Sequence, residues 1–160
     1  MTRYTTVASP IGPLVLCSNG KALTGLHMHP ATIGDDWKRD DRAAPFAVAR
    51  EQLAEYFAGE RTTFDVPLEP EGTAFQLRVW EELRAIPYGE TRSYADIARQ
   101  VGSPRGFRAV GLANGRNPIA VIVPCHRVIG ADGSLTGFGG GLDRKRTLLD
   151  LESKTRLLLR

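Results

Sequence analysis

The sequence predicts an α+β fold, with strands in the first part of the chain and mainly helices in the second. The first part contains short apolar segments of strand length, and two of them are joined by Asn19-Gly20, which supplies the positive φ angles of a tight hairpin. The second part has apolar residues at helical spacing behind two capping boxes. The turn-forming residues 69–72 separate the two patterns, so we predict domains at residues 1–71 and 72–160.

The first domain is predicted to contain several strands and one helix. Residues 30–44 are polar and acidic without a clear period, which indicates a loop. From Pro45 to Phe57 apolar residues recur at helical spacing, and Gly59 is suited to end that helix. The predicted strands cover residues 5–7, 14–17, 22–27 and 64–68.

Two helices of the second domain are predicted to begin at capping boxes. Thr73 with Gln76 opens the first, and Ser93 with Asp96 opens the second. The apolar face of the first helix consists of Phe75, Val79, Leu83 and Ile86, and Pro87-Tyr88-Gly89 ends it. The apolar face of the second consists of Tyr94, Ile97, Ala98 and Val101, and Gly102 ends it.

A third helix is predicted to begin at Ser103-Pro104 and to point Phe107 inward. Gly106 inside a helix costs roughly 1 kcal/mol relative to alanine, so we expect the start of this helix to be loose or shifted. The two helices that meet at Gly102 form a helix-turn-helix outline. Two antiparallel helices packed for structural reasons give the same outline, so both interpretations remain open.

Charge is unevenly distributed, although the net charge is only +3. Residues 31–60 contain more acidic than basic side chains, whereas residues 97–131 contain arginines and no acidic residue. The planar fork of arginine suits phosphate, so the second stretch is typical of a surface that attracts a polyanion, and equally of a solvated arginine-rich face. These arginines are Arg99, Arg105, Arg108, Arg116 and Arg127.

The composition is that of an ordinary folded protein. Of 160 residues, 42% are hydrophobic and 24% charged, so wholesale disorder is not expected. No apolar window is long enough to span a membrane and no signal pattern opens the chain, so we expect a cytoplasmic protein. The two cysteines are too few for a disulfide scaffold, which suits a reducing compartment.

Cys125 is the candidate nucleophile. It lies in the apolar run 121–130, which indicates a buried strand interrupted by Pro124, and His126-Arg127 beside it favour the thiolate form. Adjacent side chains of a strand point to opposite sides, so His126 need not contact Cys125 directly, and a water between them can carry the proton. The alternative is that Cys125 is a small buried hydrophobe, as we predict for Cys17.

The remaining motifs indicate neither a metal site nor a nucleotide site. His27, His29 and Cys17 are too few for a closed zinc site, so no metal is proposed. The glycine-rich residues 137–141 lack both the P-loop ending and the dinucleotide spacing. Their backbone N–H groups can come close to a ligand, although a flexible turn has the same composition.

Several motifs lie in a fixed order around Cys125. Pro124-Cys125-His126-Arg127 follows Asn117-Pro118-Ile119 and precedes Gly137-Phe138-Gly139-Gly140. The other motifs are Gly72 to Gln76, Val79-Trp80, Ile86 to Thr91, Ser93-Tyr94, Arg108 to Gly111 and Leu148 to Glu152, with Ser9 to Gly12 as a weaker match. In order and spacing they resemble the O6-alkylguanine-DNA alkyltransferases, also called methylated-DNA–protein-cysteine methyltransferases.

The resemblance implies a ribonuclease H-like amino-terminal half with an antiparallel sheet and a helix. It implies a winged-helix-like second half that carries a helix-turn-helix and the active-site cysteine. Cys125 would attack the alkyl carbon on O6 of a guanine flipped out of duplex DNA, and less well that of O4-methylthymine. The thioether formed is permanent, so each molecule acts once. No cofactor is implied, and we expect a monomer whose cooperativity on DNA stays open.

The resemblance also implies the roles of individual residues. His126, oriented by Glu152, takes the thiol proton through a water, and Asn117 braces the turn around the cysteine. Tyr94 assists the leaving guanine and contacts the phosphate of the flipped nucleotide. Lys145 lies close to the cysteine.

For DNA, the resemblance implies that Arg108 fills the space left by the flipped base while its helix enters the minor groove. The small residues Ala109 and Gly111 agree with that approach, and Arg105 and Arg116 add positive charge. The base pocket is expected to be walled by Val123, Pro124, Val128 and Phe138, with the N–H of Gly139 donating to O6.

This chain departs from the family pattern at two places. Phe138 stands where the family usually has tyrosine, and Arg105-Gly106-Phe107 replaces a segment of small residues. Two other functions compete with alkyl transfer. One is a non-catalytic module that senses alkylated DNA, and the other is a cysteine hydrolase that uses Cys125 and His126.

Overall fold

The computed structural model describes residues 1–29 and 32–158, with side chains as far as Thr155. The fold is α+β, as predicted. Within the described part of the chain, no helix has the length and apolar character that a membrane crossing requires. Two compact units can be distinguished, which consist of Met1–Glu71 with Pro118–Ala120 (unit 1) and of Gly72–Asn117 with Val121–Arg160 (unit 2).

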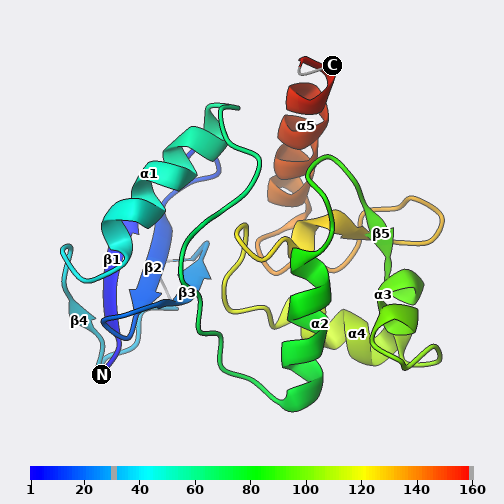
Figure 1. Cartoon of the computed structure of the whole chain (residues 1–160), viewed down its shortest axis with the longest axis horizontal. Helices are drawn as coiled ribbons and strands as arrows, with labels where there is room; N and C mark the ends of the chain where they lie inside the picture. The colour runs from blue at the N-terminus through cyan, green and yellow to red at the C-terminus, as the bar shows by residue number, and fades with distance from the viewer. Residues whose placement is uncertain (30–31, 159–160) are drawn as a thin grey trace. The chain divides into compact units, whose positions relative to one another are not determined.

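Unit 1 is built on a sheet with the strand order β3-β2-β1-β4. The strands β1 (Arg3–Val7), β2 (Leu14–Ser18) and β3 (Leu23–His27) pair antiparallel, as predicted (Figure 1). The chain turns at Asn19-Gly20 before β3, as predicted, but residues 19–22 separate the strands and Asn19 does not take a positive φ. Gly20 takes a φ of 95°, and the side chain of Asn19 accepts hydrogen bonds from the backbone of the residues that follow.

The predicted loop at residues 30–44 contains a short strand that the sequence pattern did not reveal. This strand, β4 (Lys38–Arg39), pairs in parallel with β1, and the N–H of Lys38 donates to the carbonyl of Thr2 at 2.9 Å. Two residues are too few to show a period, and the partner strand is distant in sequence. One acidic residue of the segment also contacts β1, because Asp40 forms an ion pair with Arg3 at 2.8 Å. Residues 30 and 31 lie outside the described residues.

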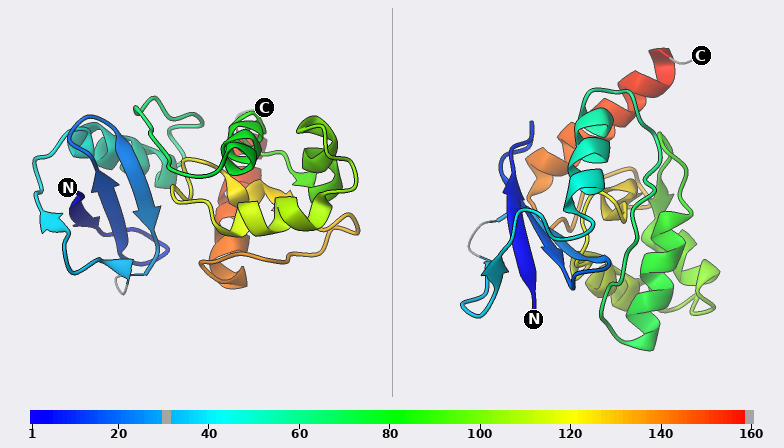
Figure 2. Two further views of the ribbon diagram at one scale, coloured as in Figure 1. Left: turned by 90° about the horizontal axis from the view of Figure 1, so that it is seen from below. Right: turned by 60° about the vertical axis from the view of Figure 1, so that its left-hand side comes forward.

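Helix α1 (Phe46–Phe57) confirms the predicted helix, and the chain turns at Gly59 with a φ of 76°. The helix lies alongside the sheet of unit 1 (Figure 2). Its apolar residues recur at helical spacing and form most of its buried face, which consists of Phe46, Ala49, Gln52, Leu53 and Tyr56.

The strand predicted at residues 64–68 is wrong. Only Leu68 forms a β-bridge, to Leu23 of β3. Instead, the side chain of Gln52 in α1 forms two hydrogen bonds with the backbone of Asp65. It accepts from the N–H at 2.8 Å and donates to the carbonyl at 3.3 Å. A side chain from the helix thus takes the place of a strand partner, and Pro67 has no N–H to offer to a ladder.

Unit 2 is mainly helical, as predicted, with α2 (Ala74–Arg84), α3 (Tyr94–Gln100), α4 (Phe107–Gly115) and α5 (Leu142–Leu158). Both capping boxes are present, with Thr73 and Ser93 as the N-cap residues of α2 and α3. Helices α2 and α4 are joined by the indole of Trp80, which donates to the carbonyl of Ala113 at 2.8 Å. A short parallel pair of strands, β5 (Arg92–Ser93) and β6 (Val128–Ile129), completes the unit.

Helices α3 and α4 form the predicted helix-turn-helix, with Gly102 at a φ of 78° between them. However, α4 begins at Phe107, with Gly106 as its N-cap residue, and not at Ser103-Pro104. The N–H of Gly106 donates to the carbonyl of Ser103 at 2.7 Å, which closes a tight turn. A Cβ at Gly106 would lie 3.1 Å from that carbonyl oxygen, so this turn favours glycine.

Candidate active site

Cys125 lies at the start of a 3-10 helix, η2 (Cys125–Arg127), and the buried strand predicted at residues 121–130 is wrong. Only β6 remains of that strand. Val121 takes a φ of 71°, which a β-branched residue rarely adopts, and Pro124 cannot donate to a ladder. The chain therefore turns sharply in front of the thiol.

Two asparagines hold this turn. The Nδ2 of Asn117 donates to the carbonyl of Val123 at 2.8 Å, and its side chain also forms a hydrogen bond with the thiol of Cys125. The Nδ2 of Asn114 donates to the carbonyl of Cys125 at 3.4 Å from a fully buried position on α4. The sequence analysis singled out Asn117 but missed Asn114, because one buried polar residue in a helix gives no distinct pattern.

Cys125 is only 5% exposed. Burial raises its pKa above the usual value, whereas the hydrogen bond from Asn117 and the charge of Lys145 act in the opposite direction and do not outweigh burial. Neighbouring groups thus favour the thiolate in direction, as predicted, but burial outweighs them. A thiol with a raised pKa is protonated at neutral pH and needs a proton acceptor before it can act as a nucleophile.

His126 has a ring nitrogen that can accept a proton. Its Nε2 lies 2.7 Å from Oε2 of Glu152, and both side chains are buried. Burial lowers the pKa of His126, so its imidazole is neutral at pH 7. Because the carboxylate of Glu152 can only accept, Nε2 carries the proton and Nδ1 the lone pair. Nδ1 has no hydrogen-bond partner among the described residues.

Glu152 is held in its ionised form. Burial alone would raise its pKa, but the hydrogen bonds and charges of His126 and Arg127 lower it to about 2. Arg127 binds the carboxylate with two donors, Nε at 2.7 Å from Oε1 and Nη2 at 3.0 Å from Oε2. Its third donor reaches the carbonyl of Ile86 at 2.8 Å, and its guanidinium lies 5.6 Å from the ring centre of Tyr88.

Arg127 therefore has a different role from the one that its position in the sequence predicted, because it binds Glu152. It was counted among the arginines without a counter-charge, yet its partner Glu152 stands 25 positions further along the chain. Arg99 is also paired, with Asp96 of its own helix. Arg105, Arg108 and Arg116 are exposed and form no ion pair with a described residue.

Lys145 and Tyr94 both fix the segment that leads into the glycine-rich loop. The buried ammonium of Lys145 donates to the carbonyls of Val128 at 2.5 Å and Thr136 at 2.7 Å. The hydroxyl of Tyr94 donates to the same Thr136 carbonyl at 3.0 Å. Burial lowers the pKa of Lys145, and its charge in turn favours ionisation of the Cys125 thiol.

The residues expected to wall a base pocket differ in exposure. Val123, Pro124 and Val128 are buried around the turn, Phe138 is half-buried and Gly139 is exposed. An open hollow of about 520 Å³ lies where α3 and α4 meet the loop. It is lined by Tyr94, Phe107, Arg108, Gly111, Leu112, Thr136 and Gly137.

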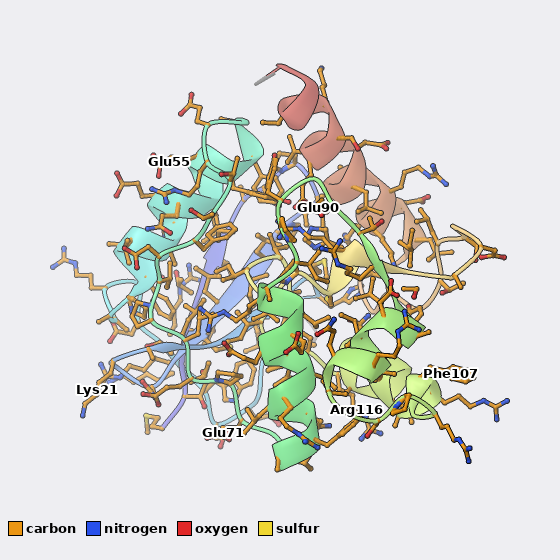
Figure 3. All side chains as sticks on the ribbon, turned by 45° about the vertical axis from the view of Figure 1, so that its right-hand side comes forward. Lys21, Glu55, Glu71, Glu90, Phe107 and Arg116 are labelled. Atoms are coloured by element: carbon orange, nitrogen blue, oxygen red, sulfur yellow. The ribbon has the colours of Figure 1, made fainter. Side chains whose placement is uncertain are left out.

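The outer face of α4 contains the residues expected to bind DNA. Arg108 and Ala109 are exposed and Gly111 is half-buried, while Arg105 precedes the helix and Arg116 follows it. Figure 3 labels Phe107 and Arg116, which mark the two ends of α4. Phe107 is 48% exposed, so the prediction that it points into the core is wrong.

Two family models match consecutive parts of the chain. The ribonuclease-like domain of 6-O-methylguanine DNA methyltransferase matches residues 2–70. The DNA-binding domain of 6-O-methylguanine DNA methyltransferase matches residues 74–154.

Curated relatives and solved structures agree with these matches. The methylated-DNA–protein-cysteine methyltransferase of Mycobacterium tuberculosis (strain H37Rv) is 59% identical over 155 residues, which cover 95% of this chain and 93% of that protein. The protein of the same name from Methanosarcina acetivorans is 51% identical over 153 residues, which cover 93% of this chain and 97% of that protein. The structure of Mycobacterium tuberculosis OGT in complex with DNA has a TM-score of 0.90 at 58% identity and covers 96% of this chain and 94% of that one. The prediction from the sequence motifs is thus confirmed, and the chain belongs to the family of methylated-DNA–protein-cysteine methyltransferases.

Proposed function

We propose that this protein repairs DNA by moving the alkyl group of an O6-alkylguanine in duplex DNA onto Cys125. The observation that carries the proposal is the buried His126–Glu152 pair next to Cys125, in which the imidazole is neutral and Nδ1 has no partner among the described residues. A buried thiol with a raised pKa needs such a base. The match of the DNA-binding family model over α2 to α5 supports DNA as the carrier of the substrate.

In the proposed reaction the thiol proton passes through a water to Nδ1 of His126, while the hydrogen bond from Nε2 to Glu152 stabilises the imidazolium that forms. The sulfur attacks the alkyl carbon in line, a C–S bond forms and the C–O bond breaks. The electron pair of that bond stays on the guanine, which finally takes up one proton, so the thiol proton balances the reaction. A thioether is not hydrolysed by an imidazole and a carboxylate, so each molecule reacts once.

We propose that Tyr94 and Gly139 form hydrogen bonds with the leaving guanine. The Tyr94 hydroxyl lines the hollow beside α4, and Gly139 is exposed in the loop, where its N–H can donate to O6. Lys145 and Asn117 would act by fixing the loop and the turn on either side of the thiol. Val123, Pro124, Val128 and Phe138 would supply apolar walls for the base.

The target base must leave the duplex before the sulfur can reach it in line. We propose that Arg108 occupies the space that the base leaves, and that Arg105 and Arg116 bind phosphates near the two ends of α4. Ala109 and Gly111 keep the helix narrow enough for a groove. We further propose that the protein acts as a monomer in the cytoplasm, where the two free cysteines stay reduced.

The test is the intact mass of the protein after incubation with excess duplex that contains one O6-methylguanine. We expect a gain of one methyl group per molecule, located on the peptide with Cys125, and no further gain with time. A duplex with O4-methylthymine is expected to give the same product more slowly. Binding of the methylated duplex without a change in mass would instead identify a sensing module, and repeated turnover would identify a hydrolase.

A further inference from the structure

Helix α4 exposes two large apolar side chains, which is unusual for a helix of nine residues. Phe107 is 48% exposed and Leu112 is 67% exposed. Both line the hollow of about 520 Å³ beside α4, together with Arg108 between them in sequence. A contiguous apolar surface of this kind commonly marks a binding site.

The apolar pair is surrounded by positive charge. The guanidinium of Arg108 lies 6.0 Å from the ring centre of Phe107, so the two side chains already contact each other. Arg105 precedes α4 and Arg116 follows it, both exposed, and the sequence has no acidic residue from 97 to 131. This face therefore complements a polyanion that offers an apolar surface between its charges. Duplex DNA is such a partner, because stacked bases lie between two rows of phosphates.

The backbone of α4 is also open to close approach next to Phe107. Gly111 lies one turn after Phe107, on the same side of the helix. A Cβ at Gly111 would lie 3.8 Å from the Tyr94 ring, an ordinary contact, so packing inside the protein does not require glycine there. Glycine weakens a helix relative to alanine, so its presence is explained better by a ligand outside the helix.

We propose that Phe107 is an apolar wedge that enters the base stack beside the extruded alkylguanine, next to Arg108. Proteins that unstack DNA insert side chains of this type between base steps, and an aromatic ring can stack on any base. The wedge holds the stack open while the target base is outside it. This inference rests on the proposed function, because it concerns the step that brings the substrate to Cys125.

The experiment compares Phe107→Ala and Phe107→Leu with the wild-type protein. Leu77→Ala is the matched control, because Leu77 is an exposed apolar residue of α2 that does not line the hollow. Each protein receives two substrates, a duplex with one O6-methylguanine and the free base O6-methylguanine, which needs no extrusion. The single-turnover rate constant of methylation is measured for each.

For Phe107→Ala we expect a loss of about ten-fold with the duplex, which corresponds to about 1.4 kcal/mol, and an unchanged rate with the free base. Phe107→Leu should stay within about three-fold of the wild type, because leucine also serves as a wedge. Leu77→Ala should equal the wild type on both substrates. An unchanged duplex rate for Phe107→Ala, or an equal loss on both substrates, overturns the proposal, and so does a leucine variant as slow as the alanine variant.

A second measurement separates wedging from electrostatic attraction. With Cys125→Ser, which cannot accept the methyl group, 2-aminopurine placed next to the lesion should brighten on binding as the stack opens. The added change Phe107→Ala should remove most of that signal and leave the salt dependence of binding unchanged, since phenylalanine neutralises no phosphate. An unchanged signal overturns the wedge. If Cys125 of the wild-type protein accepts a methyl group from neither substrate, the proposed function itself is wrong. That result differs from a wild-type protein that is active and a Phe107→Ala variant that reacts at the same rate, which overturns the wedge alone.

Discussion

The two cysteines of this protein share burial and differ in almost everything else. Cys17 lies in β2 and is 2% exposed, and Cys125 lies in η2 and is 5% exposed. Burial raises the pKa of Cys17 to about 12, with no other cause acting on it. At Cys125 burial also raises the pKa, but a hydrogen bond from Asn117 and the charge of Lys145 oppose the increase. Burial alone makes a thiol inert, and only built-in polar partners can make a buried thiol useful.

The packing around the two sulfurs shows the same contrast. A Cβ at Gly25 of β3 would lie 3.3 Å from the sulfur of Cys17, so the strands leave little space for a reactant. Around Cys125 the backbone turns instead of pairing, and Asn114 and Asn117 take up the carbonyls that a strand would have used. The carbonyls of Val123 and Cys125 therefore have hydrogen-bond partners although the backbone there is irregular.

The largest expected effect tests this comparison directly. Cys125→Ala should abolish methyl transfer from a duplex that contains O6-methylguanine, whereas Cys17→Ala should transfer one methyl group at close to the wild-type rate. Intact mass after incubation measures both. The alanine at position 17 removes one buried sulfur, so its free energy of unfolding should fall by about 1–2 kcal/mol without an effect on the reaction. Methylation of the Cys125→Ala protein at Cys17 would contradict the comparison.

The second prediction concerns the ion pair below the reactive turn. Glu152→Ala leaves Arg127 buried without its carboxylate, so the free energy of unfolding should fall by about 3–5 kcal/mol. Urea titration measures the change. The double variant Arg127→Met, Glu152→Leu removes the unpaired charge and should recover part of this loss. The Nε2–H of His126 and the carbonyl of Ile86 lose their partners in this variant, which costs about 1–3 kcal/mol each.

The double variant also separates stability from chemistry. It should remain at least about 100-fold slower in methyl transfer, because His126 has lost the carboxylate that orients it and stabilises its protonated form. A double variant that is stable and fully active would show that Glu152 only compensates Arg127. Unfolding of the double variant at 25 °C would show instead that the surrounding packing depends on the charged pair.

The difference between the two cysteines also limits what sequence can predict. The strands of unit 1 and both capping boxes follow from local patterns, and they are confirmed. The turn at Cys125 depends on Asn114, Asn117 and Pro124 together, and their contacts are set by tertiary packing. An apolar run therefore predicted a strand where none forms. Arg127 was misassigned for the same reason, because its charge partner lies on a different helix.

The third prediction is a loss of stability in acid that depends on Glu152. Its pKa is lowered from the ordinary value of 4.5 to about 2 in the folded protein, so the folded state favours the carboxylate. This stabilisation is complete above pH 4.5 and is lost as the pH falls towards 2, and it amounts to about 3 kcal/mol. His126 also destabilises the folded protein as the pH falls below 6.5, because burial lowers its pKa and the folded state therefore resists its protonation. Urea midpoints between pH 7 and 3 should fall more steeply for the wild type than for the Arg127→Met, Glu152→Leu variant, and parallel curves would contradict the prediction.

The smallest expected effects concern Lys145 and Tyr94, which both donate a hydrogen bond to the carbonyl of Thr136. Lys145→Met removes a buried charged donor that also binds the carbonyl of Val128, and should lower the free energy of unfolding by about 1–3 kcal/mol. Tyr94→Phe removes a more exposed neutral donor, and should cost about 0.5–1.5 kcal/mol or less. Hydrogen exchange of the amides of residues 131–141 reports the loop directly and should accelerate more for Lys145→Met. If the two variants loosen the loop equally, the buried charge contributes nothing beyond one hydrogen bond. If Tyr94→Phe slows methyl transfer more than Lys145→Met does, the hydroxyl acts on the leaving guanine and not through the loop.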